Sequence, residues 1–266
     1  IAANPASTSQ AVTVNVICDA VQTEVQKPKL YLLAVGVSKY SKEQFNLRFA
    51  DRDAEAFTAA WQAQEGLVYD EVATKLVVNE EASSRNILSA MDWLVKSVTQ
   101  RDVAVMFVSA HGIRDSRQNY YLATHEVDPD SLRSTAVRFS EIKEVLRDLP
   151  CKVMLFVDTC HSGGVTGAKS LAWEDPLHDL VSEECGAVVF SSSLPREVSL
   201  EDPSWGHGAV TKALLDAFGN PESDTNGDGY LSISELEAQV YDRVKQMTKG
   251  NQHPVVERPP TIRNFS

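Results

Sequence analysis

The chain has 266 residues, of which 43% are hydrophobic and 23% are charged, and its formal net charge is −12. These values are typical of a globular protein that is long enough to bury a sizeable core. The acidic balance excludes nucleic acid and anionic membrane surfaces as main partners, because both repel a negatively charged protein. No apolar run approaches the roughly 18 residues of a membrane span, so we expect no membrane contact.

The cysteines show neither a CxxC pair nor metal-ligand spacing, and they are too few for a disulfide scaffold in a chain of this length. They are Cys18, Cys151, Cys160 and Cys185. This usage favours a reducing compartment, and we therefore expect a cytoplasmic location.

Residues 1–28 differ from the rest of the chain. They contain a stretch of small polar residues, an alternating segment typical of a strand, and the linker-like "QKPK". We interpret them as an N-terminal extension, either the tail of a preceding module or an added edge strand. An N-terminal partner module is therefore expected in the full-length protein.

From residue 29 onwards, strand and helix patterns alternate. Continuous apolar runs, typical of strands buried on both faces, cover residues 29–37, 103–110, 152–158 and 186–193. Helical patterns cover residues 49–64, 83–98, 138–149, 206–218 and 232–248. This alternation predicts an α/β fold with a mostly parallel central sheet and helices on both faces.

Two of the predicted strands end beside chemically active residues. The strand over 103–110 runs into His111, and the strand over 152–158 is followed by Cys160. Parallel strands end at one edge of the sheet, so a cysteine nucleophile and a histidine base are expected to meet there. His161 is the poorer base, because neighbouring side chains on an extended segment point to opposite sides.

An oxyanion site is expected at the same edge. Gly112 lets a substrate carbonyl approach the backbone, and the backbone N–H groups near Gly112 and Cys160 are its candidate donors. The alternative is that Cys160 is an inert buried thiol and His111 a core histidine, because free cysteine is among the most buried residue types.

The segments "VMFVSAHG" and "VMLFVDTCHSGG" resemble the caspase and metacaspase clan, specifically the bacterial metacaspase-like (orthocaspase) cysteine peptidases. The resemblance implies that residues 29–266 form a peptidase domain with the caspase-haemoglobinase fold. It also implies that His111 is the general base or acid and that Cys160 is the nucleophile.

The position of Asp158, two residues before Cys160, raises a question. Residues two apart on a strand face the same side, yet a nearby carboxylate disfavours the thiolate. The resemblance supplies an explanation, because metacaspases cleave after Arg or Lys and receive that side chain in an acidic pocket. Asp158 is then expected to bind the substrate cation.

The same resemblance implies two further pocket residues. The family's pocket serine, two residues before the histidine, falls on Ser109. Its second aspartate lies in a motif that resembles "LRFADRDA" and falls on Asp53. The match is partial, because the Gly and Cys of that motif are replaced, so Asp51 remains the alternative.

The segment "DTNGDGYLSISE" has the spacing of an EF-hand calcium loop, with predicted helices on either side. Its candidate ligands are Asp224, Asn226, Asp228, Tyr230 and Glu235. The alternative is a polar turn between two helices that has the same residue pattern but binds no metal. The calcium site of the family, where present, uses an acid soon after the cysteine, and residues 161–170 contain none. No cofactor is therefore expected to be required, although calcium is a candidate ligand of this loop.

The sequence also suggests minor roles for several other residues. Lys169 is the one basic residue in the loop after the nucleophile and is the candidate site of self-cleavage. Exposed-loop or neighbouring-subsite roles are expected for Glu197, Glu201, Asp202 and Trp205. Surface or capping roles are expected for His125, His178, His207 and His253.

These observations predict a cysteine endopeptidase that cleaves proteins or peptides after Arg or Lys through a Cys-His dyad and an acyl-enzyme. The alternative is a catalytically silent regulatory or scaffold module on the same fold, because a fold does not establish an activity.

Overall fold

The computed structural model describes residues 26–158, 186–192, 197 and 199–265, together with two short paired strands, β1 (Ala3–Asn4) and β2 (Ser7–Thr8). The predicted strand between residues 11 and 20 lies outside the described residues. Among the described residues, no helix combines the length and apolar character needed to cross a membrane.

A six-stranded sheet forms the centre of the molecule, in the order β13-β10-β9-β5-β3-β4. Its strands are β3 (Leu30–Gly36), β4 (Val72–Val78), β5 (Val103–Ser109), β9 (Lys152–Asp158), β10 (Ala187–Ser191) and β13 (Val255–Glu257). All neighbours are parallel except β13, which pairs antiparallel with β10. The prediction of a mostly parallel sheet is confirmed, and the fold is consistent with the caspase-haemoglobinase class.

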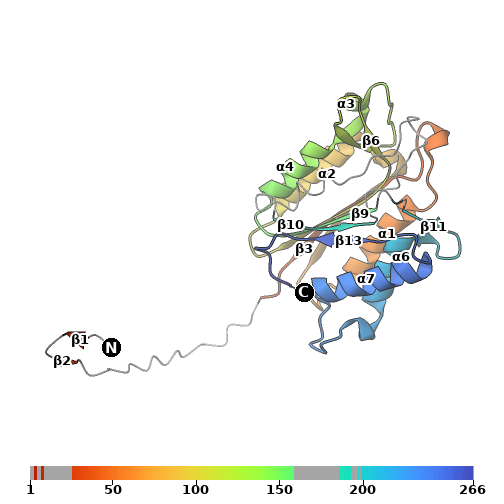
Figure 1. Cartoon of the computed structure of the whole chain (residues 1–266). Helices are drawn as coiled ribbons and strands as arrows, with labels where there is room; N and C mark the ends of the chain where they lie inside the picture. Colours follow the sequence, from red (N-terminus) through yellow and green to blue (C-terminus); the bar gives the residue numbers. More distant parts are fainter. Residues whose placement is uncertain are drawn as a thin grey trace.

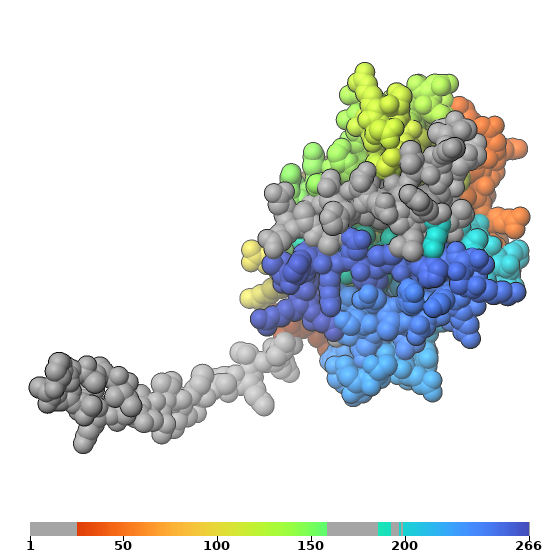
Figure 2. All heavy atoms as spheres, in the orientation of Figure 1, coloured from red at the N-terminus to blue at the C-terminus, as the bar shows by residue number. Residues whose placement is uncertain are grey.

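Helices cover both faces of this sheet (Figure 1). On one face lie α2 (Ser84–Ser97) and α4 (Phe139–Asp148), and on the other lie α1 (Ala50–Gln62), α6 (Ala209–Gly219) and α7 (Ile233–Met247). The hydroxyl of Ser83 caps α2 by accepting from the Asn86 backbone N–H at 3.2 Å, as helix N-termini favour. In the space-filling view, the blue C-terminal part of the chain covers the lower half of the visible face (Figure 2).

Smaller elements complete the described structure. Two further sheets contain β6 (Gly112–Arg114), β7 (Tyr120–Ala123) and β8 (Ala136–Arg138) in one, and β11 (Glu201–Asp202) and β12 (His207–Gly208) in the other. Short helices are η1 (Glu43–Phe45), η2 (Asn79–Glu81), α3 (Leu132–Thr135) and η3 (Pro221–Ser223). The sequence patterns did not predict β4, because Thr74 and Lys75 interrupt its apolar run on this edge strand.

The register of the parallel strands places their carboxyl ends side by side. Ser109 at the end of β5 pairs with Gly36 of β3 on one side and with Asp158 of β9 on the other. His111 follows Ser109 at this edge, which we call the carboxyl edge. Ligands of open parallel sheets bind beyond such an edge, so the topology defines where a site can be built.

Candidate functional site

His111 is held in one orientation by the backbone. Its main-chain N–H donates to the Tyr40 hydroxyl at 3.0 Å, and its carbonyl accepts from the Ala123 N–H at 2.8 Å. The side chain is buried, and its Nε2 lies 2.8 Å from the carbonyl oxygen of Phe45 in η1. Because a carbonyl can only accept, Nε2 carries the proton in the neutral ring, which makes Nδ1 the basic nitrogen.

The Phe45 carbonyl is therefore one group that orients the histidine. The sequence patterns did not identify it, because a backbone carbonyl carries no residue-type signal. The Tyr40 ring adds a second restraint, with its centroid 5.3 Å from that of His111.

The other expected catalytic groups are placed only in part. Gly112 opens β6 directly after His111 and pairs with Leu122 of β7. Cys160 and Lys169 lie outside the described residues. The described chain stops at Asp158, two residues before Cys160, at the same edge of the sheet as Ser109.

Asp158 is a buried carboxylate at the end of β9. One of its oxygens accepts from the Ser199 hydroxyl at 2.6 Å, and the other accepts from the Thr211 hydroxyl of α6 at 3.2 Å. Burial raises the pKa of Asp158, and these hydroxyl hydrogen bonds oppose the rise. Neutral donors compensate a buried negative charge only in part.

Asp53 is the second acid at this position. It lies in the first turns of α1, is 1% exposed, and accepts from His207 Nδ1 at 2.7 Å and from the Gly208 N–H at 3.1 Å. Burial raises its pKa to about 6, although the hydrogen bond from His207 opposes this rise. The expectation of a surface or capping role is wrong for His207, which pairs with this buried acid.

Gly208 shows how close the two carboxylates are. A Cβ built at this position would lie 2.8 Å from Asp158 Oδ2 and 3.2 Å from Asp53 Oδ2, so the two oxygens are no more than about 6 Å apart. Only glycine leaves the space between them open. Ser109 lies on the β5 position paired with Asp158, so its side chain belongs to the same face of the sheet.

Asp51, the alternative to Asp53, faces a different environment. It accepts from the Ser38 hydroxyl at 2.7 Å and from the Asn79 side-chain amide at 2.8 Å. These hydrogen bonds lower the pKa of Asp51 despite its partial burial. Both of its oxygens are used to join the loop after β3 to η2, so Asp51 acts structurally and Asp53 is the acid beside Asp158.

Glu201 of β11 is a third acid close to this pair. Burial raises its pKa to about 7, and the negative charges of Asp158 and Asp53 add to the rise. The expectation for Glu201 was only a loop or neighbouring-subsite role. Together, Asp53, Asp158 and Glu201 form what we call the acid cluster, a concentration of negative charge at the carboxyl edge that favours a cationic ligand.

The EF-like loop lies apart from the acid cluster. Asp224 accepts from the backbone N–H groups of Gly227 at 2.8 Å and of Gly229 at 2.8 Å, and Gly229 has the left-handed φ of 84° that this tight turn needs. Glu235 accepts from Ser232 and from Thr225, which lowers its pKa to about 2.

The five expected calcium ligands therefore belong to an ordered loop, but their carboxylates bond to the loop itself. Over the described ranges, no three Asp, Glu, His or Cys side chains are grouped so as to hold a metal ion. Calcium binding by this loop stays a prediction.

Comparison with known proteins identifies the fold and the family. The caspase-domain family model matches residues 29–266. The chain belongs to the caspase-domain family. This is a family of cysteine peptidases.

Among solved structures, the caspase domain of this chain resembles protein GSU0716 from Geobacter sulfurreducens, with a TM-score of 0.62 and 17% sequence identity. The match covers 88% of this chain and 95% of that chain, and at this identity it shows the fold alone. No curated protein matches the chain.

Proposed function

We propose that this caspase domain is a cysteine endopeptidase that cleaves proteins or peptides after Arg, and less efficiently after Lys. The observation that carries the proposal is the acid cluster at the carboxyl edge, which includes Asp158 at the end of β9, two residues before Cys160. The oriented His111 at the neighbouring strand end supports the same chemistry.

In the proposed reaction, His111 Nδ1 accepts the thiol proton of Cys160, and the sulfur attacks the substrate carbonyl carbon. The backbone N–H groups of Gly112 and Cys160 stabilise the oxyanion. His111 then protonates the leaving amine, and water releases the acyl group from the sulfur. The Phe45 carbonyl favours the imidazolium, because it accepts from Nε2–H throughout.

Substrate selection in this proposal rests on charge. A guanidinium offers several N–H donors in a fixed plane and can bond two carboxylates at once, whereas an ammonium is a compact point charge. Asp53 and Asp158, about 6 Å apart or less, suit the planar group better. A substrate Asp is rejected, because it would add a like charge to the acid cluster.

Labelling with a peptidyl-Arg electrophile, followed by mass spectrometry, tests the nucleophile. We expect one adduct, on Cys160, and its loss in Cys160→Ala. The matched control is Cys151→Ala, because burial raises the pKa of the Cys151 thiol to about 11 and leaves it unreactive. An adduct elsewhere, or full peptidase activity in Cys160→Ala, would overturn the proposal.

Matched fluorogenic peptides with Arg, Lys or Asp before the reporter test the specificity. We expect kcat/KM to be highest for Arg, lower for Lys and undetectable for Asp. Cleavage after Asp, or no cleavage of any peptide by correctly folded protein, would favour another specificity or a silent scaffold domain.

A further inference from the structure

A cavity lies at the far end of the helical layer that carries the acid cluster. α1 and α6 both begin near Asp53 and Gly208, and both end at a cavity of about 330 Å³. Along α1, Trp61 follows Asp53 by eight residues, which corresponds to about 12 Å at 1.5 Å per residue. The cavity is thus a separate place in the molecule and not an extension of the proposed active site.

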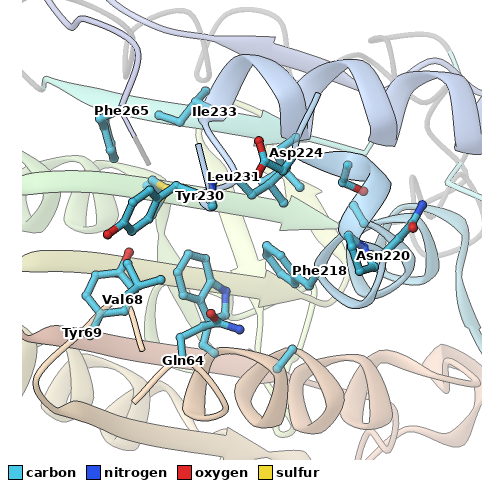
Figure 3. Close-up of a pocket in the computed structure, with 18 residues that line it drawn as sticks. Gln64, Val68, Tyr69, Phe218, Asn220, Asp224, Tyr230, Leu231, Ile233 and Phe265 are labelled. Carbon is cyan, nitrogen blue, oxygen red and sulfur yellow. Dashed lines mark hydrogen bonds between the residues drawn. The ribbon is translucent and has the colours of Figure 1, made fainter. Parts of the chain in front are cut away.

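The walls of this cavity are mainly apolar and come from segments far apart in the sequence (Figure 3). They include Trp61, Val68, Phe218, Leu231, Ile233 and Phe265. In the close-up, Tyr69 and Tyr230 lie at one end and Phe218 and Asn220 at the other (Figure 3). Such a concave, largely apolar space with a few polar groups is typical of a small-molecule site.

Two polar atoms of the lining residues distinguish this cavity from a packing defect. Trp61 Nε1 and Ser223 Oγ are buried, and neither has a hydrogen-bond partner among the described residues. Buried polar groups in native proteins nearly always form hydrogen bonds, so each exception indicates a site where a ligand or water can supply the partner. Both residues line the same cavity, although 162 positions separate them in the sequence.

The chemistry of these groups defines the partner. An indole N–H can only donate, and a serine hydroxyl donates readily, so the missing partner has acceptor atoms. Tyr69 adds a third donor, because burial raises the pKa of its phenol to about 12 and keeps the proton on the oxygen.

The charge of the lining argues against an ion. Asp224 also lines the cavity and repels an anion. A cation is also disfavoured, because the buried indole N–H of Trp61 is a donor and cannot act as its ligand. What remains is a neutral molecule.

We propose that this cavity is a binding site for a neutral, largely apolar small molecule whose carbonyl or ether oxygen accepts hydrogen bonds from Trp61 Nε1–H and the Ser223 hydroxyl. Both atoms are buried in the present conformation, so in this proposal their hydrogen bonds to a ligand require neighbouring groups to shift. Tyr230, which is 49% exposed at the cavity, is placed to move on entry. The site is independent of the peptidase function proposed above.

Three probes with one bicyclic body test this inference by calorimetry on the full chain in EDTA. They are 2-acetylnaphthalene, which has a neutral acceptor, naphthalene, which has none, and 2-naphthoate, which is an anion. We expect saturable binding of the ketone, with about tenfold weaker binding of each of the other two probes. No saturable ketone binding up to millimolar concentration, or equal affinity for ketone and naphthalene, would overturn the inference.

Two variants locate the site. Trp61→Phe keeps an aromatic ring but removes the donor, and Ser223→Ala removes the hydroxyl; each is expected to weaken ketone binding about tenfold. The matched control is Trp93→Phe, because Trp93 packs on the opposite face of the sheet and should leave the affinity unchanged.

The indole N–H signal of Trp61 in a ¹H–¹⁵N spectrum gives an independent readout. It should move downfield with the ketone and not with naphthalene, and the Trp61→Phe spectrum assigns it. An unmoved Trp61 signal at saturation, or unchanged affinity in both Trp61→Phe and Ser223→Ala, would contradict the proposed contacts.

Discussion

Removing the charge of Asp53 should make the protein more stable at neutral pH. Asp53→Asn keeps the size of the side chain and one acceptor oxygen but cannot ionise. In the native protein, burial raises the pKa of Asp53 to about 6, compared with the usual 3.8. The fold therefore favours the protonated carboxyl, even though His207 and Gly208 donate hydrogen bonds to it.

The sign and size of the effect follow from proton linkage. Between pH 3.8 and about 6 the folded state binds more protons at Asp53 than the unfolded state, so the free energy of unfolding falls as the pH rises. At 1.36 kcal/mol per pH unit, the difference between the two pKa values corresponds to about 3 kcal/mol. Asp53→Asn should match the native protein near pH 4 and exceed its stability by about 3 kcal/mol at pH 7.5.

Urea denaturation at a series of pH values, followed by circular dichroism, measures this difference. The matched control is Asp51→Asn, two residues away on the same helix. Hydrogen bonds from Ser38 and Asn79 lower the pKa of Asp51, so this carboxylate stabilises the fold once it is ionised. Asp51→Asn should therefore be less stable than the native protein at pH 7.5, which is the opposite sign.

The reasoning would be refuted if the stability difference between Asp53→Asn and the native protein did not change with pH. It would equally be refuted if Asp53→Asn were the less stable protein at pH 7.5 while Asp51→Asn was unaffected. Either result would mean that Asp53 is compensated as a charged group in the fold.

Four further outcomes are expected. Gly208→Ala should abolish cleavage after Arg while the protein stays folded by circular dichroism, because its Cβ would lie 2.8 Å from Asp158 Oδ2; activity close to native would contradict this. Glu201→Gln should lower kcat/KM for Arg peptides about tenfold at pH 8 and less at pH 6, because the pKa of Glu201 is raised to about 7; an equal loss at both values would refute an electrostatic role. If the EF-like loop binds calcium, calcium should raise Tm, and Asp224→Ala should remove that shift; calorimetry without binding at millimolar calcium would leave the polar-turn interpretation. Slow self-cleavage after Lys169 should appear on N-terminal sequencing of aged active protein, and an intact chain would count against it.

Sequence patterns were sufficient for the architecture and for the edge that carries the chemistry. Apolar runs long enough for buried strands, alternating with helical patterns, predicted β3, β5, β9 and β10. Because parallel strands end together, the residues that follow β5 and β9 were expected at one edge, and the register of Ser109 with Asp158 confirms this geometry. These features depend on local periodicity, which the sequence displays directly.

The partners of each side chain were decided by the tertiary structure. Asp51 and Asp53 are both acids in the first turns of α1, and a helix turns by about 200° over two residues, so one faces Ser38 and the other faces Asp158. Only the packing of α1 against the sheet determines which of these two acids lies beside Asp158. His207, 154 positions from Asp53, could be assigned to it only when the chain was folded.

Two kinds of feature could not be predicted from residue types: the roles of backbone groups and the hydrogen-bonding state of buried polar atoms. The Phe45 carbonyl orients His111 through an atom that every residue has, so no pattern of residue types marks it. The unbonded atoms of Trp61 and Ser223 can be recognised only in the folded chain, where the described residues supply them with no partner. The sequence determined the strands and the residues at their ends, because periodicity is local, whereas the fold decided which groups meet, because that depends on contacts between distant segments.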